Sequence, residues 1–218
     1  MDIFDIIGPI MVGPSSSHTA GAVRIGLVAR KLLGREPVKA ELLLHGSFAA
    51  TGRGHGTDLA LIAGLLGYAP DDRRIPTAFD CAKQAGLDFS FTSGTLRNAH
   101  PNSVQIKLSA ADGTTVNVIG VSIGGGRIEI RELEGMKLCF SAEVPTLIVR
   151  NHDNPGSVAD VSYMLSRLNI NIATFQVTRN ARGGEAAMVI ECDAPIESEL
   201  IARIASMPGI ISVVGINP

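Results

Sequence analysis

The sequence has few of the features that several large protein classes require. It contains no tryptophan, only 4% of its 218 residues are aromatic, and its net charge is −2 without a block of basic residues. Proteins that bind nucleic acid gather Lys and Arg on one face, so no nucleic-acid partner is expected. No uninterrupted run of 18 apolar residues is present and the N-terminus lacks a basic segment. We therefore expect a cytoplasmic protein without a membrane span.

Cysteine is scarce and dispersed. Cys81, Cys139 and Cys192 form no C-x-x-C pair, no cysteine–histidine pair at zinc spacing and no run suited to an iron–sulfur cluster. Isolated cysteines usually pack as small hydrophobic residues. We therefore expect no metal ligand in this chain.

Hydrophobic residues make up 45% of the chain, and their spacing predicts two domains, residues 1–140 and residues 145–218. In the first domain, helical spacing follows residue 20, and residues 38–45 form a predicted strand. Residues 46–57 resemble a glycine-rich loop. Short helices are expected at 59–66 and 77–85, the second with Thr77 and Asp80 spaced as a capping box. Four strands between residues 89 and 131 complete an α+β domain with an antiparallel sheet.

The second domain shows the order β-α-β-β-α-β. The predicted strands are 146–149, 170–179, 186–191 and 210–216, and the predicted helices are 158–168 and 196–206. This is the ferredoxin-like order. A turn at Asn154, Pro155 and Gly156 opens the first helix.

This order and the Asp153–Gly156 turn resemble the ACT domain, a regulatory module that pairs through its sheets. In ACT domains this turn often lines an amino-acid site. The resemblance therefore makes Asn154, Pro155 and Gly156 a possible effector site, and a plain Asx-type turn is the alternative. Pairing through this domain or through the N-terminal domain would give a homodimer.

The segment Ser15, Ser16, Ser17, His18 and Thr19 places four hydroxyls and an imidazole where a helix is expected to begin. The first N–H groups of a helix lack internal partners and attract anions, so this segment is a candidate carboxylate or phosphate site. The alternative is ordinary N-capping, which needs only one hydroxyl.

The first 140 residues resemble the beta chain of bacterial iron–sulfur L-serine dehydratases. The resemblance is carried by four motifs in order, namely Gly-Pro-Ser-Ser-Ser-His-Thr at 13–19, Gly-Arg-Gly-His-Gly-Thr-Asp at 52–58, His-Pro-Asn at 100–102 and Ser-Ile-Gly-Gly-Gly at 122–126. In that family L-serine is converted to pyruvate and ammonia with the help of a [4Fe–4S] cluster. The cluster ligands lie on a separate alpha chain or in the C-terminal half of a fused enzyme. The resemblance thus implies an alpha-subunit partner and a chain that is inactive alone.

Within that reaction His55 is the candidate general base. Its imidazole has an ordinary pKa of about 6.5 and its flanking glycines leave room for a substrate. A histidine in such a segment can instead serve only as a local hydrogen-bond partner. The candidate substrate-binding residues are Ser15, Ser16, Ser17, His18, Thr19, Thr57, Asp58, His100 and Asn102.

Several of these candidates have a purely structural alternative. Thr57 and Asp58 are also placed to cap the next helix, and Asp58 could orient His55. His100 precedes a proline and could only shape a turn. Gly124–Gly126 could form a backbone anion nest or a strand bend.

A different class of function also fits the sequence. The first domain resembles the allosteric substrate-binding domain of some phosphoglycerate dehydrogenases as well, which predicts a non-catalytic amino-acid-sensing subunit. A pure sensor does not need an imidazole at position 55, whereas an elimination does. A scaffold for an alpha chain is a third reading, and it leaves the polar segment 15–19 unexplained.

Overall fold

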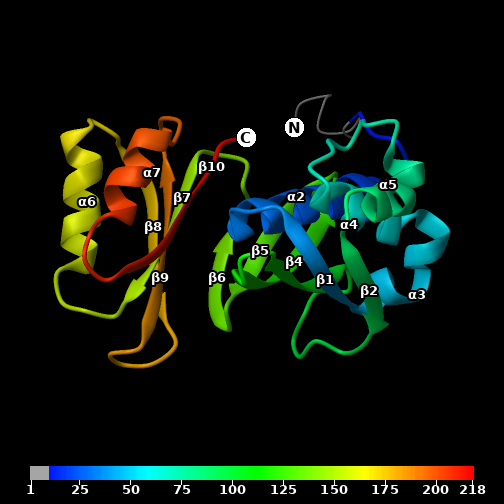
Figure 1. Cartoon of the computed structure of the whole chain (residues 1–218), viewed down its shortest axis with the longest axis horizontal. Helices are drawn as coiled ribbons and strands as arrows, with labels where there is room; N and C mark the ends of the chain where they lie inside the picture. Colours follow the sequence, from blue (N-terminus) through cyan, green and yellow to red (C-terminus); the bar gives the residue numbers. More distant parts are fainter. Residues whose placement is uncertain (1–9) are drawn as a thin grey trace. The chain divides into compact units, whose positions relative to one another are not determined.

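The computed structural model describes residues 10–218, apart from the side chain of Arg53. The chain divides into two compact units, one that ends at Glu134 and one that begins at Gly135. Both units mix helices with strands, so the predicted α+β class is confirmed (Figure 1). The first nine residues of the predicted domain 1–140 lie outside the described residues.

The first unit opens with a single π-helical turn, η1 (Ser16–Ala20), which continues directly into α2 (Gly21–Leu33). Ser15 is the N-cap of η1, and its hydroxyl accepts the backbone N–H of His18 at 3.3 Å. Gly34 ends α2 in the left-handed conformation. The other helices of this unit are α3 (Gly46–His55), α4 (Thr57–Leu65), the 3₁₀ turn η2 (Ile75–Thr77) and α5 (Ala78–Gln84).

Within the described residues, one sheet contains six strands in the order β2-β1-β3-β4-β5-β6. These strands are β1 (Pro37–Leu44), β2 (Asp88–Ser93), β3 (Ser103–Ala110), β4 (Thr115–Gly124), β5 (Arg127–Leu133) and β6 (Met136–Phe140). β1 and β2 are parallel, whereas β1–β3, β3–β4 and β4–β5 are antiparallel. β6 is a strand beyond the four that we expected between residues 89 and 131.

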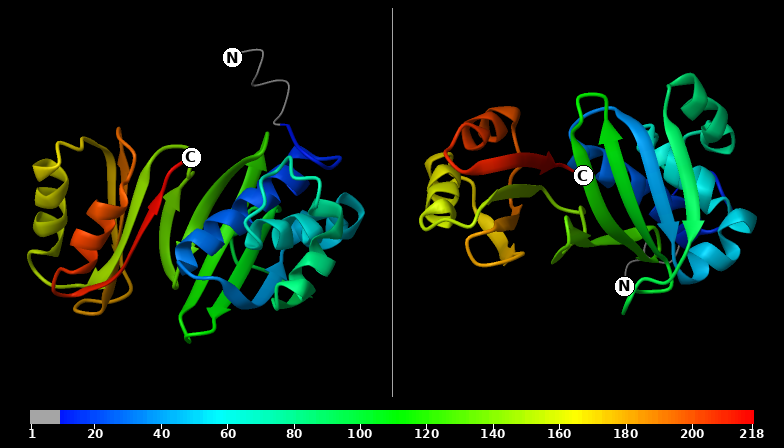
Figure 2. Two further views of the ribbon diagram at one scale, coloured as in Figure 1. Left: turned by 45° about the horizontal axis from the view of Figure 1, so that its top comes forward. Right: turned by 60° about the horizontal axis from the view of Figure 1, so that its bottom comes forward.

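Helix α2 covers one face of this sheet (Figure 2). Along β4 the residues Val118, Gly120 and Ser122 are buried, and a Cβ added to Gly120 would lie 2.4 Å from the Ile25 side chain on α2. Because side chains alternate along a strand, Ser122 points to the same face as Gly120 and Val118. Ser122 therefore lies on the face that α2 covers, at the start of this helix.

Helices α2 and α4 meet through two glycines. A Cβ on Gly64 would lie 2.1 Å from the carbonyl oxygen of Val23, and a Cβ on Gly26 would lie 2.5 Å from that of Leu61. The two backbones are therefore in direct contact, which no residue larger than glycine permits without movement. This contact fixes α4, and with it Thr57, against the start of the unit.

The glycine-rich segment 46–57 is helical, so the predicted loop was wrong. Phe48 is fully buried and anchors α3, and Gly56 separates α3 from α4 in the left-handed conformation with φ 68°. Each helical glycine costs about 1 kcal/mol relative to alanine, so the three glycines within α3 cost about as much as the burial of one phenylalanine contributes, roughly 1.5–3 kcal/mol. Tertiary packing thus offsets the poor local propensity here.

The capping box predicted at Thr77 and Asp80 was also wrong. Thr77 precedes α5, but its side chain makes no capping hydrogen bond. Its hydroxyl instead donates to the carbonyl oxygen of Arg74 at 3.1 Å. The hydroxyl therefore bonds back to the preceding 3₁₀ turn and accepts no N–H of α5.

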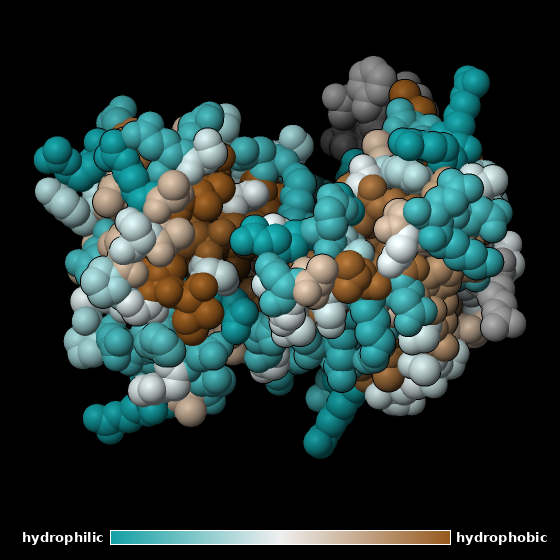
Figure 3. All heavy atoms as spheres, viewed as in Figure 1, coloured by the Kyte–Doolittle hydropathy of each residue, from teal (hydrophilic) through white to brown (hydrophobic). Residues whose placement is uncertain are grey.

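The second unit has the predicted ferredoxin-like order. After β6 its elements are β7 (Thr146–His152), α6 (Ser157–Arg167), β8 (Ile172–Arg179), β9 (Glu185–Cys192), α7 (Ser198–Ala205) and β10 (Ile210–Ile216). The last four strands form a sheet in the order β10-β7-β9-β8. Val161 and Leu165 of α6, with Leu200 and Ile204 of α7, join the buried core of this unit. Figure 3 shows that hydrophobic side chains also reach the surface of this unit, at the left of the view.

Among the described residues, no helix combines the length and the apolar character needed to cross a bilayer.

Candidate active site around the first helical turn

Helix α3, which carries His55 of the second motif, meets the first motif through His18. The Nε2 atom of His18 lies 3.2 Å from the hydroxyl oxygen of Ser47 and 3.2 Å from that of Thr51. Ser47 and Thr51 are one turn apart on α3. The His18 ring also contacts the edge of Phe48, with ring centroids 5.4 Å apart. The π-helical turn and α3 are thereby joined through one imidazole.

The third and fourth motifs meet at the same place. The backbone N–H of Ser47 donates to the carbonyl oxygen of Pro101 at 2.8 Å, and the backbone N–H of Ser122 donates to that of Asn102 at 3.0 Å. A Cβ on Gly21 would lie 2.2 Å from the Ser122 hydroxyl, so this side chain packs closely against the start of α2. The fourth motif therefore packs against the end of η1, and the third motif joins the fourth to α3.

Two imidazoles lie side by side in this cluster. The ring centroids of His18 and His55 are 5.0 Å apart, with the ring planes inclined by 42°. His55 is exposed in the last turn of α3. Burial lowers the pKa of His18, the nearby His55 lowers it further, and a hydrogen bond with the Ser47 backbone partly offsets both effects. His18 is thus held in its neutral form at pH values where a free histidine begins to gain a proton.

Three buried hydroxyls near η1 have no hydrogen-bond partner among the described residues. They belong to Thr19, Thr57 and Ser122, whose side chains are buried to 98% or more. A buried polar group without a partner costs roughly 1–3 kcal/mol, so such groups are rare and often mark functional sites. Thr57 is the first residue of α4 after the N-cap Gly56, so it is not the cap that we considered.

The remaining candidates lie nearby but make local contacts. The carboxylate of Asp58 accepts the backbone N–H of Leu59 at 2.9 Å, and the structure gives it no hydrogen bond to His55. The side chain of His100 is exposed, and its Nδ1 accepts the backbone N–H of Asn102 at 3.1 Å, as expected for a residue that shapes a turn. Gly124–Gly126 form the bend between β4 and β5, where Arg24 donates to the Gly126 carbonyl oxygen.

Ser16 and Ser17 are half-buried members of the π-helical turn. Ser15 carries out the ordinary capping role by itself, so the other hydroxyls of the segment are not needed as caps. A π-helical turn is uncommon and occurs frequently at functional sites. The structure therefore leaves the segment 15–19 as a candidate anion site with one cap.

Sequence reasoning did not single out Ser47 and Thr51. Both lie in the segment that resembled a loop, where no periodic side-chain placement was expected. Their spacing of four residues around the hydrophobic Phe48 and Ala49 was the available signal, because it places two hydroxyls on one face of a helix. The four glycines of segment 46–57 predicted a loop, so this helical spacing was not recognised.

In the second unit the predicted effector turn is braced by Asp153. Its carboxylate accepts the backbone N–H of Gly183 at 3.0 Å and a hydrogen bond from Arg179 at 2.8 Å. These two contacts, the Gly183 N–H first, lower the pKa of the Asp153 carboxyl. Gly156 follows as the N-cap of α6 in the left-handed conformation, with φ 96°. These contacts and the conformation of Gly156 fix the turn at Asn154 and Pro155 at the start of α6.

We expect Asp153→Asn to lower the thermal midpoint of the second unit near pH 7. A carboxyl whose pKa is depressed by folding stabilises the fold above its ordinary pKa, and that contribution is lost as the pH falls. The difference between wild type and variant should therefore shrink as the pH falls below the ordinary aspartate pKa of about 3.9, in thermal unfolding followed by circular dichroism. Arg179→Gln leaves the Gly183 contact intact and should have the smaller effect. Equal midpoints at pH 7 would contradict this account.

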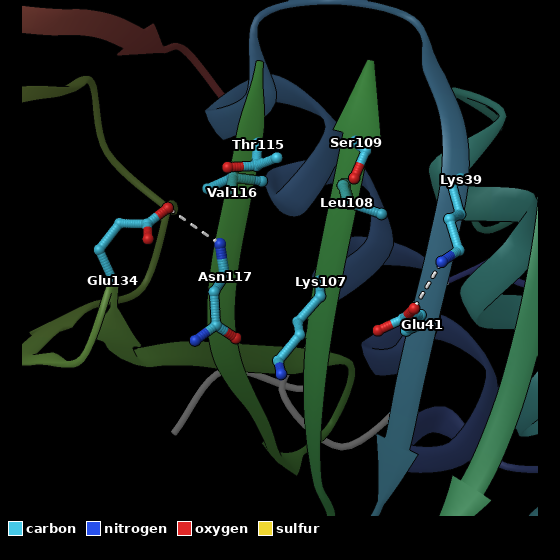
Figure 4. A pocket seen from close by; sticks show the side chains of 9 residues that line it. All are labelled: Lys39, Glu41, Lys107, Leu108, Ser109, Thr115, Val116, Asn117 and Glu134. Atoms are coloured by element: carbon cyan, nitrogen blue, oxygen red, sulfur yellow. Dashed lines mark hydrogen bonds and ion pairs between the residues drawn. The ribbon is translucent and has the colours of Figure 1, made fainter. Parts of the chain in front are cut away.

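A separate hollow of about 210 Å³ lies on the first sheet and is lined by polar side chains of three adjacent strands and Glu134 (Figure 4). Lys39 donates to Glu41 at 2.7 Å, and Glu134 accepts the backbone N–H of Asn117 at 3.0 Å. No residue of the four motifs lines this hollow. Lys39 and Glu41 pair with each other and Glu134 binds the backbone, so we do not assign this hollow a function.

The described part of the chain contains no group of three or more His, Cys, Asp or Glu side chains placed to hold a metal ion. Cys81, Cys139 and Cys192 are free, and Cys192 is buried in the core of the second unit. Burial raises the pKa of the Cys192 thiol, which disfavours the thiolate that a metal requires. These residues do not fit an iron–sulfur cluster.

The chain is similar to several known proteins. The family model "Serine dehydratase beta chain" matches residues 1–86. The chain is 44% identical to the probable L-serine dehydratase beta chain of Bacillus subtilis, over 97% of this chain and 96% of that one. It is 43% identical to the L-serine dehydratase beta chain of Peptoniphilus asaccharolyticus, over 92% and 91%. The D-3-phosphoglycerate dehydrogenase of Bacillus subtilis is 28% identical over 71% of this chain and 29% of its own length. The chain belongs to the family of L-serine dehydratase beta chains.

Proposed function

We propose that this chain is the beta subunit of an L-serine ammonia-lyase, which converts L-serine to pyruvate and ammonia together with an alpha subunit. The observation that carries the proposal is the pair of imidazoles, His18 and His55, with centroids 5.0 Å apart at the hydroxyl-rich start of η1. Extensive identity to two beta chains named for this enzyme supports it. A cytoplasmic location and pairing into a homodimer stay predictions from the sequence.

The reaction makes three demands on its site. The Cα proton of serine must be removed, the β-hydroxyl must leave as water, and the carboxylate and amine must be held. Loss of the proton and the hydroxyl gives 2-aminoacrylate, whose imine tautomer adds water and releases ammonia and pyruvate. Groups of this chain are proposed for the first and third demands.

His55 is the proposed base. It is exposed, its neighbours Gly54 and Gly56 carry no side chains, and a Cβ on either glycine would meet no atom within 4 Å. A substrate can therefore approach this imidazole closely. Proton transfer by a positioned side chain typically contributes 10²–10⁴-fold to the rate, a range that sets the expected effect of removing it.

The start of η1 is the proposed carboxylate site. Ser15 caps this helical N-terminus, and Ser16 and Ser17 bring hydroxyl donors to it, where backbone N–H groups without helical partners attract anions. No positively charged side chain is then required. The orphaned hydroxyls of Thr19 and Thr57 border this region and stay candidates for contact with substrate.

We assign the [4Fe–4S] cluster to the alpha subunit, because the cysteines of this chain do not fit it. When bound there, such a cluster supplies a Lewis acid for the hydroxyl of the substrate. The second unit is proposed to serve assembly or regulation, with Asn154, Pro155 and Gly156 as the possible effector site.

The alternative is a non-catalytic subunit that senses an amino acid. The similarity to a phosphoglycerate dehydrogenase over 71% of this chain favours it, since that similarity extends into both units. The exposed imidazole of His55 favours catalysis. The two readings differ in whether this chain supplies a reacting group.

Anaerobic assays of pyruvate formation with L-serine test the proposal. The chain alone, the reconstituted alpha subunit alone and their complex are compared at equal concentrations. We expect pyruvate only from the complex. Full turnover by the alpha subunit alone, with this chain changing only the response to an amino acid, would establish the sensing role instead.

A further inference from the structure

The contacts of His18 determine which of its ring nitrogens carries the proton. Ser47 and Thr51 approach the same nitrogen, Nε2, each at 3.2 Å. A neutral imidazole has one N–H donor and one bare acceptor nitrogen, and its partners decide which is which. Whether the Ser47 and Thr51 hydroxyls donate to Nε2 or accept from it therefore decides whether Nε2 carries the hydrogen.

The hydroxyl of Thr51 donates its only hydrogen within its own helix. Its Oγ1 donates to the backbone carbonyl oxygen of Ser47 at 3.0 Å, one helical turn earlier. A hydroxyl has a single hydrogen, so toward Nε2 of His18 this oxygen can only accept. A bare Nε2 would place two lone pairs 3.2 Å apart. An Nε2 that carries the hydrogen avoids this repulsion.

Ser47 is consistent with the same assignment. Its hydroxyl oxygen lies 3.4 Å from Oγ1 of Thr51, to which it can donate, while it accepts from Nε2 of His18. The single N–H of His18 is then shared between two oxygens on one helix face. Both hydroxyls keep their hydrogens occupied.

The opposite nitrogen is left as the acceptor. Nδ1 of His18 lies 3.4 Å from the Ser15 hydroxyl, which already accepts the backbone N–H of His18 at 3.3 Å. The hydrogen of Ser15 is thus free to point at Nδ1. A bare Nδ1 orients this hydroxyl, whereas a protonated Nδ1 would turn its hydrogen away.

We propose that Ser47 and Thr51 fix His18 as its Nε2–H tautomer, so that Nδ1 is the acceptor that orients the Ser15 hydroxyl at the start of η1. Ser47 and Thr51 are therefore positioning residues, which act through His18. That the Ser15 cap held in this way leaves the hydroxyls of Ser16 and Ser17 available for a substrate carboxylate rests on the proposed function. The tautomer itself does not rest on it.

The test uses nuclear magnetic resonance of the full chain with ¹⁵N-labelled histidine, at about pH 8, where an ordinary imidazole is neutral. Long-range ¹H–¹⁵N correlations distinguish a protonated nitrogen from a bare one, and His18→Gln identifies the His18 signals by their loss. We expect a protonated Nε2 and a bare Nδ1. The opposite tautomer, or an equal mixture, would overturn the proposal.

Thr51→Val and Thr51→Ser form the matched pair of variants. Valine keeps the shape and removes the acceptor, so it should give a mixture of tautomers, whereas serine should keep the wild-type signals. Thr51 is exposed, so neither change is expected to prevent folding. An unchanged tautomer in Thr51→Val and also in Ser47→Ala would refute the role of these hydroxyls.

The effect of the His18 tautomer on the reaction is measured separately, as kcat/KM of the complex with the alpha subunit. Thr51→Val should lower kcat/KM about tenfold, and Thr51→Ser should restore it. A changed tautomer with wild-type kcat/KM would overturn the role assigned to Ser15. A confirmed tautomer in a complex that forms no pyruvate would instead refute the proposed function and leave the tautomer assignment in place.

Discussion

Replacing His55 by alanine is expected to reduce pyruvate formation from L-serine by at least about 100-fold in the reconstituted complex. The exposed imidazole is the proposed acceptor of the Cα proton, and His18 beside it is held neutral by burial. The lowered pKa makes the His18 imidazole a weaker base and therefore a poor replacement for His55. The loss should fall mainly on kcat, because His55 is not among the groups proposed to hold the carboxylate.

A structural role of His55 would give a different pattern. Because its side chain is exposed, the alanine variant should unfold within about 0.5 kcal/mol of wild type and should still copurify with the alpha subunit. His152→Ala, which removes another exposed imidazole from the second unit, is the matched control and should retain wild-type turnover. Normal turnover by His55→Ala would place the base elsewhere and favour the sensing subunit.

The sequence predicted the second unit well because its signals agree with one another. Alternating strands, helical spacing and turns at Asn154–Gly156 and Arg182–Gly184 all indicate the same order, and the structure has that order. Local preference and tertiary packing point the same way there. Such agreement is what makes a sequence easy to interpret.

The same reasoning failed at segment 46–57, where local preference and packing disagree. Four glycines argue against a helix, yet buried Phe48 and the adjoining helices hold α3 in place. The failure lies at the proposed site, where Gly54 and Gly56 leave the space around His55 open. Sequence patterns thus failed to predict α3, because its glycines leave room for a substrate at His55 and do not favour a helix.

The convergence of motifs could be expected only in part. The resemblance to a known family grouped the segments 13–19, 52–58, 100–102 and 122–126, but the residues themselves do not show which contacts join them. Those contacts depend on β4 and α3 meeting η1, which are long-range pairings. The orphaned Ser122 hydroxyl and the hydroxyls of Ser47 and Thr51 became visible only in three dimensions.

Gly64→Ala is expected to destabilise the first unit by about 3 kcal/mol or more, which is at the upper end for overpacking. The added Cβ would lie 2.1 Å from the Val23 carbonyl oxygen and 2.9 Å from the Cα of Gly26, and both are backbone atoms that no rotamer change can move. Helices α2 and α4 would have to separate along their contact. The free energy of unfolding in urea, followed by circular dichroism, measures the loss.

Gly54→Ala is the matched control, since Gly54 is also helical but a Cβ there would meet no atom within 4 Å. Alanine in an open helical position should be neutral or stabilise by up to about 1 kcal/mol, because glycine loses more chain entropy on folding. Equal effects of the two substitutions would show that helix propensity, and not backbone contact, governs both. If Gly64→Ala alone destabilises the unit, the α2–α4 contact is what sets the position of Thr57 against η1, and the geometry of the candidate site depends on a glycine pair outside all four motifs.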